Sequence, residues 1–312
     1  MKDVNKYLQN ELEQNSTIIV SCSGGPDSMC LLYLLLSFKN TFNLNIICAH
    51  VNHNVREESV EEEEFVKKYC ESNDIKFECL QIDSYRGNFH NDARVLRYNF
   101  LNDLLTKYNS KFLFTAHHGD DLVETILMRI SRGSNLIGYS GFKINNKIIN
   151  HKVIRPLIFV TKSEIENYNS ENNIEYRIDI TNKSLEYTRN KYRHIALPAL
   201  KKIDNDIHLK FLKFSEKLIE YDDFVKSYII SKGLLVDNYI DVPLYLKEDE
   251  FIRKSTIELY ISNLQKVEQF YTTDNIVFEI DKLLKSEKGK ANINLPNGFF
   301  GIKKNKKFTI EK

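Results

Sequence analysis

The feature that most constrains this chain is a short loop between a strand-like and a helix-like segment. Residues 23–28, with the sequence Ser-Gly-Gly-Pro-Asp-Ser, follow an apolar, β-branched run at residues 17–20 and precede an apolar stretch typical of a helix. Two consecutive glycines let the chain turn tightly and bring backbone N–H groups close to an anion. Ser28 is expected to cap the helix, whose positive end faces the same point. The loop therefore predicts a site for nucleotide phosphates, with an ordinary strand-to-helix corner as the alternative.

The loop is not a Walker A motif, because no lysine stands here to hold the β and γ phosphates. It resembles instead the SGGxDS loop of the PP-loop ATP pyrophosphatases. This resemblance implies that ATP is cleaved between its α and β phosphates, so that a carbonyl oxygen or a carboxylate becomes adenylated and pyrophosphate leaves. The residues expected to bind ATP are Ser23, Gly24, Gly25, Pro26, Asp27 and Ser28.

The composition fits a globular protein with room for two domains. The chain has 312 residues, of which 42% are hydrophobic and 12% aromatic. Its longest apolar run, residues 29–36, is too short to cross a bilayer, and residues 1–16 contain no apolar signal segment. These features predict a cytoplasmic protein without a membrane partner. The five cysteines include no Cys-x-x-Cys pair, which favours buried free thiols.

Short apolar runs alternate with helical patterns in the first part of the chain. The expected strands are 17–20, 45–51, 76–82 and 111–116, and the expected helices are 28–38, 57–71, 93–108 and 122–130. This order predicts an α/β fold, a doubly wound parallel sheet, in which ligands lie beyond the carboxyl ends of the strands. A capping box at residues 161–164 predicts a further helix that starts near Ser163.

After about residue 200 the pattern becomes mostly helical. Helices are expected at 206–231, 248–264 and 275–286, and a Leu-Pro-Asn-Gly turn at 295–298 is expected between two short strands. The sequence thus predicts two domains. Residues 1–205 would form the PP-loop ATP pyrophosphatase domain, and residues 206–312 a smaller, mainly helical domain.

Three carboxylates follow the fourth expected strand. Asp121 and Glu124 are three residues apart and share one helix face, and Asp120 and Asp121 flank the positive helix end. Such carboxylates can hold Mg²⁺ through few direct ligands, and the metal would neutralise charge on a departing pyrophosphate. An ordinary acidic helix start is the alternative. Zinc bound by His117, His118, His50 or His53 is a weaker alternative, because no cysteine or third histidine stands at metal-ligand spacing.

Arginines provide candidate contacts for phosphates. Arg94 and Arg97 stand three residues apart on an expected helix, beside Tyr98, and a guanidinium pair can bind phosphates or stack on a base. Arg132 follows the acidic helix and precedes a Gly-Ser turn, whose free N–H groups would also favour an anion. Exposed surface arginines and a simple helix stop are the alternatives.

The formal net charge is only +1, so nucleic-acid binding would require a local excess of positive charge. Two basic stretches provide such an excess, and a solvated lysine-rich surface is the alternative reading of both. Their basic residues are Arg189, Lys191, Arg193, Lys201, Lys202, Lys210, Lys213 and Lys217, then Lys285, Lys288, Lys290, Lys303, Lys304, Lys306, Lys307 and Lys312.

Seven segments, taken in order, resemble the tRNA(Ile)-lysidine synthase family. They are residues 23–28, 50–56, 93–98, 117–125, 132–134 and 155–157, and a set at Asp179, Thr181, Asn182, Arg189, Asn190 and Arg193. After residue 215 the resemblance rests on length and helical character, with the turn at 295–298 as its best local signal.

The resemblance implies modification of the wobble cytidine in the CAU anticodon of an isoleucine tRNA, which the second domain would bind. The cytidine C2 oxygen attacks the α phosphate of ATP, and the amine of free lysine then displaces AMP. ATP and Mg²⁺ are the implied cofactors, with Asp27 and Asp121 as the metal residues, and Asp121 is the candidate for metal or base. The implied catalytic residues are Asp27, Asp121, Glu124, Arg94, Arg97 and Arg132.

Two other functions fit parts of the sequence. A tRNA 2-thiolation enzyme of the same superfamily would need a reactive cysteine or an iron–sulfur cluster, and Cys22 is the thiol beside the loop. A non-catalytic ATP-binding sensor would not require the clustered carboxylates. The sequence leaves the oligomeric state open, with a homodimer among the alternatives.

Overall fold

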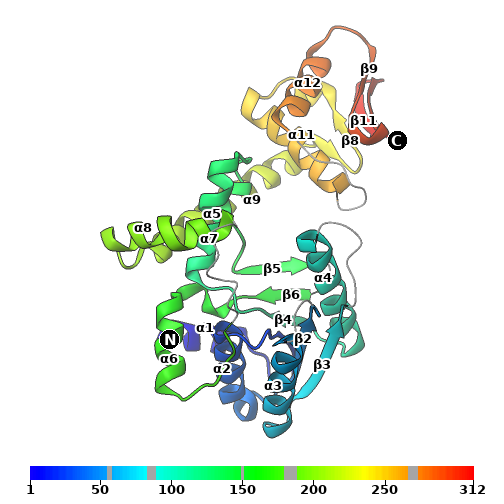
Figure 1. Ribbon diagram of the computed structural model, residues 1–312. Coiled ribbons are helices and arrows are strands. Elements are labelled where there is room, and N and C mark those ends of the chain that lie inside the picture. The colour runs from blue at the N-terminus through cyan, green and yellow to red at the C-terminus, as the bar shows by residue number, and fades with distance from the viewer. Residues whose placement is uncertain (55–57, 83–88, 149–150, 179–187, 266–272) are drawn as a thin grey trace. The chain divides into compact units, whose positions relative to one another are not determined.

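A computed structural model describes residues 1–54, 58–82, 89–148, 151–178, 188–265 and 273–312 (Figure 1). The chain divides into two compact units, residues 1–216 and residues 217–312. The division falls inside helix α9 (Ile207–Ser231), later than the expected boundary after residue 205. Residues 55–56 of the segment at 50–56, and Asp179, Thr181 and Asn182, lie outside the described residues.

The first unit is built on a six-stranded sheet with the order β3-β2-β1-β4-β6-β5. The strands are β1 (Thr17–Ser21), β2 (Asn45–Asn52), β3 (Lys76–Gln81), β4 (Phe112–Phe114), β5 (Asn145–Ile148) and β6 (His151–Ile154). All neighbouring pairs are parallel except β5 with β6. The four expected strands are therefore confirmed, and β5 and β6 extend the sheet beyond them.

Helices pack on both faces of this sheet (Figure 1). The helices of this unit that precede α9 are α1 (Lys2–Glu11), α2 (Pro26–Phe42), α3 (Glu58–Ser72), α4 (Phe89–Lys107), α5 (Gly119–Arg132), α6 (Lys162–Glu171), α7 (Thr188–Lys191) and α8 (Leu197–Ile203). Short 3-10 turns lie at Gly138–Ser140 and Pro156–Phe159, and a π-type turn at Tyr192–Ala196 links α7 to α8.

Strand β1 shows why helices are needed on both sides. Its side chains alternate between the two faces, as the strand period requires. Ile18 and Val20 belong to a buried cluster with residues of α2, α3 and α6, whereas Ile19 packs with Leu101 and Leu104 of α4. The predicted doubly wound α/β fold is confirmed.

The capping box predicted at residues 161–164 is also confirmed. Thr161 Oγ1 accepts a hydrogen bond from Glu164 N–H (3.3 Å), and Glu164 Oε2 accepts one from Thr161 N–H (2.8 Å). This reciprocal pair fixes the start of α6, so that Lys162 is the first helical residue.

The second unit combines helices with a small antiparallel sheet. Besides the end of α9, its helices are α10 (Val242–Tyr245), α11 (Glu250–Gln265) and α12 (Asp274–Lys285). Its strands are β7 (Leu235–Val236), β8 (Tyr239–Asp241), β9 (Lys290–Asn294), β10 (Phe300–Lys304) and β11 (Lys307–Glu311), in the order β7-β8-β11-β10-β9. The predicted helices are confirmed, but only two of these strands were expected.

The predicted turn at residues 295–298 joins β9 to β10. Asn297 and Gly298 adopt φ values of 59° and 79°, the left-handed region that asparagine and glycine tolerate best. The core of this unit is formed by large buried side chains such as Tyr245, Tyr260 and Phe308. The smaller, mainly helical part of the predicted fold is thus confirmed, with the sheet as an addition.

The five cysteines are free thiols, and four of them are buried, as predicted. Within the described part of the chain, no helix is both long and apolar enough to span a bilayer.

Candidate active site

The glycine-rich loop opens helix α2 at the carboxyl end of β1. Gly24 has a φ of 83°, a conformation that residues with a side chain rarely adopt. Gly25 is the N-cap, and the first intrahelical hydrogen bond of α2 runs from Met29 N–H to Gly25 O (3.0 Å). The N–H groups of Asp27 and Ser28 therefore precede that bond and are open to a ligand at the positive helix end.

The prediction that Ser28 caps this helix is wrong. Because Gly25 is the N-cap and Pro26 the first helical residue, Ser28 lies inside the first turn. Its hydroxyl donates to Gly25 O (3.0 Å) and accepts from Ser23 N–H (3.2 Å). Ser28 thus holds the loop closed from within and leaves the helix end open to a ligand.

Helix α5 starts beyond the carboxyl end of β4 and carries three buried carboxylates. Asp120 accepts hydrogen bonds from Lys162 N–H (3.0 Å) and from Lys201 Nζ (2.7 Å). Asp121 accepts one from the backbone N–H of His118 (3.1 Å). These bonds join the start of α5 to α6 and α8, so the expected carboxylate cluster exists and is held by neighbouring elements.

Two arginines bind the other carboxylate oxygens. Arg189 donates through Nη2 to Asp121 Oδ1 (2.7 Å) and through Nε to Glu124 Oε2 (2.7 Å). Arg193 donates through Nε to Glu124 Oε1 (2.7 Å) and lies 3.3 Å from Asp121 Oδ1 through Nη2. The side chain of Glu124 is only 1% exposed, so the arginines compensate its buried charge.

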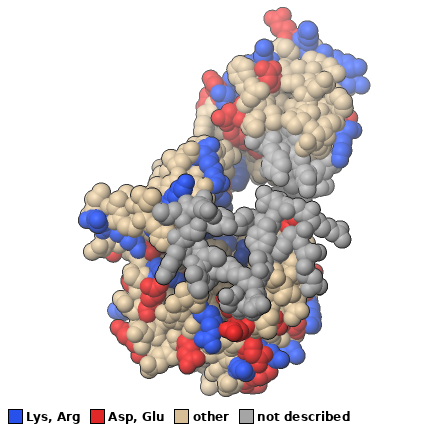
Figure 2. Space-filling model, in the orientation of Figure 1, with Lys and Arg blue, Asp and Glu red and all other residues tan. Residues whose placement is uncertain are grey.

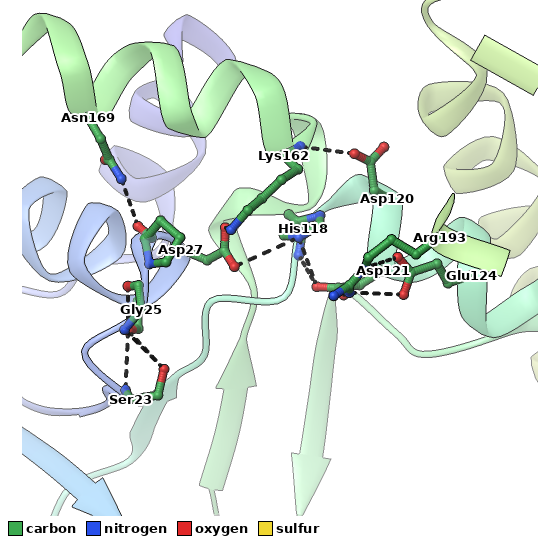
Figure 3. Close-up of polar contacts among 12 residues, drawn as sticks. Ser23, Gly25, Asp27, His118, Asp120, Asp121, Glu124, Lys162, Asn169 and Arg193 are labelled. Atoms are coloured by element: carbon green, nitrogen blue, oxygen red, sulfur yellow. Dashed lines mark hydrogen bonds and ion pairs between the residues drawn. The ribbon is translucent and has the colours of Figure 1, made fainter. Parts of the chain in front are cut away.

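His118 and Asp27 connect this cluster to the glycine-rich loop (Figure 3). Asp27 Oδ1 accepts a hydrogen bond from Lys162 Nζ (2.6 Å), and Asp27 Oδ2 lies 4.0 Å from His118 Nε2. The same nitrogen lies 3.4 Å from Asp121 Oδ2. The predicted metal residues Asp27 and Asp121 are therefore both brought close to Nε2 of His118.

The environment shifts two pKa values in this cluster. Burial alone would raise the pKa of Asp121, but the charges of His118 and Arg189 outweigh it and hold that pKa well below the usual range. Burial lowers the pKa of His117 to about 4. The charge of Asp121 acts in the opposite direction and raises this pKa, whereas nearby arginines, including Arg97, lower it further. Asp121 is therefore ionised and His117 neutral at pH 7.

Arg94 and Arg97 lie on α4 and flank one aromatic ring. Their guanidinium carbons are 5.3 and 5.6 Å from the ring centre of Tyr98, a cation–π geometry. Burial is the main cause of the lowered pKa values of His117 and Arg155. The charge of Arg97 adds to the effect on His117, and the charge of Arg94 adds to the effect on Arg155. Among the described residues, neither of the two predicted arginines forms a hydrogen bond or an ion pair with the carboxylates of α5.

The expectation for the turn after Arg132 is wrong. Gly133 N–H donates to Ile130 O (3.3 Å) and Ser134 N–H donates to Tyr139 Oη (3.0 Å), so this turn does not offer free donors. Arg132 itself is exposed at the end of α5. Among the described residues, no hydrogen bond or ion pair joins Arg132 to the carboxylate cluster.

Several residues of the cluster were not predicted as site residues. Arg189 and Arg193 had appeared as part of a basic stretch and of a segment that resembles the family, without an assigned role, and Lys162 only as a position inside a capping box. The four-residue spacing of the arginines was the available signal, since it places both on one helix face. Their carboxylate partners lie more than sixty residues away in sequence, and nothing local indicates that pairing.

The donor set at Asp27 fits a magnesium ion. Its side chain is 29% exposed, and Oδ2 makes no hydrogen bond within the described part of the structure. Mg²⁺ in nucleotide sites commonly takes one or two carboxylates and completes its shell with phosphate oxygens and water. Both oxygens of Asp121, in contrast, already accept hydrogen bonds. No three His, Cys, Asp or Glu side chains converge on a metal position among the described residues.

The fold and this loop place the chain in a known family. The chain belongs to the PP-loop domain family, whose model matches residues 1–200. Among solved structures, it is similar to the U34-tRNA thiolase NcsA from Methanococcus maripaludis with its [4Fe-4S] cluster. The TM-score is 0.61 with 22% identity, over 70% of this chain and 77% of that one. At this identity the similarity concerns the fold alone.

Curated relatives are closer in sequence. A tRNA(Ile)-lysidine synthase from Bacillus cereus (strain ATCC 14579) is 42% identical over 228 residues, which cover 71% of this chain and 48% of that protein. The bifunctional protein TilS/HprT from Listeria monocytogenes serovar 1/2a is 33% identical over 312 residues, covering 95% of this chain and 48% of that protein. The chain therefore spans about half the length of the curated relatives it matches.

Proposed function

We propose that this chain modifies tRNA by joining lysine to C2 of the wobble cytidine in the CAU anticodon of isoleucine tRNA. The C2 oxygen of the cytidine attacks the α phosphorus of ATP, which forms an adenylated base and releases pyrophosphate. The amine of free lysine then attacks C2, AMP leaves, and lysidine remains. The reaction would take place in the cytoplasm, where ATP, lysine and tRNA are available.

The observation that carries this proposal is the open helix end behind the glycine-rich loop, in a chain related to proteins named tRNA(Ile)-lysidine synthase. Backbone N–H groups at a helix start bind phosphates without a lysine side chain. With the outer phosphates held there, the α phosphorus is left accessible to a nucleophile. The N–H groups of Asp27 and Ser28, and Lys162, whose Nζ bonds Asp27, are the donors that would contact these phosphates.

Asp27 is the residue that would hold Mg²⁺, because its side chain at the phosphate loop is partly exposed and its Oδ2 makes no hydrogen bond within the described residues. The metal would neutralise charge on the departing pyrophosphate. Asp121 is less suited to be the proton acceptor for the lysine amine, since its depressed pKa makes it a weak base. Of the two roles that the sequence left open for Asp121, the metal role fits Asp27 better.

Arg94 and Arg97 would hold the cytidine and its phosphate. A base must leave its stack before its C2 oxygen can reach ATP. The guanidinium groups beside Tyr98 offer a planar, positively charged surface on which such a base can stack. Arg132, which is exposed on α5, stays a prediction as an RNA phosphate contact.

The second unit would bind the RNA backbone through one face of its sheet. In the strand register, Lys304 of β10 lies directly opposite Lys290 of β9 and Lys307 of β11, and all three are exposed. Like charges directly opposite each other destabilise a sheet, so such a row favours an anionic partner. Blue side chains lie along the side of this unit that carries β9 and β11 (Figure 2).

Other lysines of this basic stretch have structural partners. Lys285 forms an ion pair with Asp281 (2.8 Å). Lys303 is buried and donates through Nζ to Leu284 O (2.8 Å) and Ser286 O (2.6 Å), at the end of α12. The binding surface is therefore narrower than the sequence stretch and is centred on the lysine row.

The test is transfer of labelled lysine. The full chain is mixed with ATP, Mg²⁺, labelled lysine and either the CAU isoleucine tRNA or the same tRNA with uridine at the wobble position. Label should enter only the cytidine-containing tRNA. Folded protein that binds ATP but never labels that tRNA would refute the proposal.

A further inference from the structure

Glu124 has no free oxygen with which to touch a substrate. It is completely buried, Oε1 accepts from Arg193 Nε (2.7 Å), and Oε2 accepts from Arg189 Nε (2.7 Å) and Arg193 Nη2 (3.1 Å). A metal ligand or a general base needs an accessible lone pair. In this arrangement the hydrogen bonds of Glu124 are all directed at the two guanidinium groups.

Asp121 is engaged in the same way. Its Oδ1 accepts from Arg189 Nη2 (2.7 Å), and its Oδ2 accepts from His118 N–H (3.1 Å). The two carboxylates therefore form a frame in which each arginine is bonded through both Nε and Nη2. A planar guanidinium anchored along one edge has a fixed orientation.

The outer edges of the arginines remain available. The side chains of Arg189 and Arg193 are 42% and 31% exposed, and neither Nη1 group has a partner among the described residues. The Lys162, Asp27 and His118 contacts connect this pair to the phosphate loop (Figure 3). Donors fixed in advance and facing solvent next to a phosphate loop are suited to an anion, because binding needs little reorganisation.

We propose that Asp121 and Glu124 are positioning residues that hold Arg189 and Arg193 as a preformed clamp for a phosphate group. Opposite charge within the clamp lets the chain keep two arginines together in the absence of that phosphate. The ligand is a phosphate of the nucleotide, released as pyrophosphate, or a phosphate of the RNA. This inference deepens the proposed function and rests on it, because the proposed reaction supplies both sources of phosphate, the nucleotide and the RNA.

The experiment measures binding of inorganic pyrophosphate to the full chain by calorimetry, in EDTA and without tRNA. The variants are Glu124→Gln, Glu124→Asp and Arg193→Lys. Because EDTA removes free Mg²⁺, a role of Glu124 in metal binding cannot change this affinity. Positioning predicts about tenfold weaker binding for Glu124→Gln and Arg193→Lys, and a smaller loss for Glu124→Asp, which keeps the charge.

Arg253→Lys is the matched control. Arg253 also bonds a buried carboxylate, Asp281 (3.0 Å), but in the second unit. It should leave pyrophosphate affinity unchanged. Thermal melts identify any variant that does not fold, and Arg193→Lys, at a more exposed side chain, keeps the test decisive if Glu124→Gln unfolds. Wild-type pyrophosphate affinity in folded Arg193→Lys and Glu124→Gln would overturn the clamp for the nucleotide phosphates.

Affinity for tRNA, measured on the same variants, separates the two sources. Weaker tRNA binding with unchanged pyrophosphate binding assigns the clamp to RNA. Unchanged binding of both ligands overturns the inference altogether. Since neither measurement requires lysine transfer, a failure of the proposed function would leave these results standing and interpretable.

Discussion

The two units of this chain use positive charge in opposite ways. In the first unit, Arg189, Arg193 and Lys201 are each bonded to a buried carboxylate of α5. In the second unit, Lys290 and Lys304 face each other across a strand pair with no carboxylate bonded to either among the described residues. Paired charge fixes the position of side chains, whereas unpaired charge of one sign is suited to attract a mobile anion. Under the proposed function, this difference assigns catalysis to the first unit and RNA binding to the second.

The same contrast exists between adjacent residues of β10. Lys303 faces the core and caps the end of α12, while Lys304 faces solvent. Because successive strand residues point to opposite faces, these two lysines differ in role although they are neighbours in sequence. They provide matched substitutions for the second unit.

The largest expected effect is on catalysis in the first unit. Asp121→Asn removes the charge that orients Arg189 and that compensates both guanidinium groups. We expect turnover to fall by about 100-fold or more, as for loss of one preorganised catalytic group. The chain should still fold, with a loss of about 1 to 3 kcal/mol for the weakened charged hydrogen bonds. Single-turnover rates and denaturant unfolding measure the two effects. A variant that works at the wild-type rate would remove Asp121 from the site.

The next effect concerns RNA binding by the second unit. Lys304→Ser should weaken binding severalfold for every tRNA, whatever its nucleotide sequence. It should also reduce the slope of log affinity against log salt concentration by about 1. Its stability should stay equal or rise slightly, because repulsion from Lys290 and Lys307 is relieved. Filter binding over a salt series measures the slope. An unchanged slope would mean that the lysine row does not contact phosphate.

Lys303→Met should give the reverse result. Methionine keeps the length of the side chain but cannot donate to Leu284 O and Ser286 O. We expect a loss of about 1 to 2 kcal/mol in unfolding free energy, by analogy with other cap substitutions, and an unchanged salt slope for tRNA. Denaturant unfolding and filter binding decide. If Lys303→Met changes the salt slope as Lys304→Ser does, the two faces of the sheet are not distinct.

The smallest expected effect is the part of the pH dependence that comes from histidine, which belongs to the first unit because all eight histidines lie at or before residue 208. Burial lowers the pKa of His117 to about 4, below its unfolded value of about 6.5. Between those values the unfolded chain binds more protons, so stability is lost as pH falls from 6.5 towards 4. Hydrogen exchange, corrected for intrinsic rates, should show this loss at α5 and less of it in His117→Asn. Equal pH dependence in both proteins would exclude His117 as the cause.

Local patterns in the sequence predicted most of the fold. The β-branched run at 17–20, the glycine-rich loop and the capping box at Thr161 each contain their own structural signal within a few residues. The outer strands β5 and β6 were missed because they are short and polar at their start. In the second unit, β7 and β8 have two and three residues, too few for a periodic pattern.

The site was only partly predictable for a different physical reason. The spacing of Asp121 and Glu124 indicates a shared helix face, but their bonds to Arg189 and Arg193 depend on how distant segments pack. Ser28 was assigned to the N-cap from its residue type, whereas Gly25 and Pro26 start the helix earlier. Residue type and spacing identified the chemical groups at this edge of the sheet. Which carboxylate bonds which arginine is seen only in the structure.

The most direct test of the account is the identity of the nucleotide product. The chain is incubated with ATP labelled separately at the α and γ phosphates, together with lysine and the CAU isoleucine tRNA. If the loop holds the outer phosphates and RNA attacks the α phosphorus, AMP and pyrophosphate will appear in equal amounts and only when that tRNA is present. Formation of ADP and inorganic phosphate would contradict it.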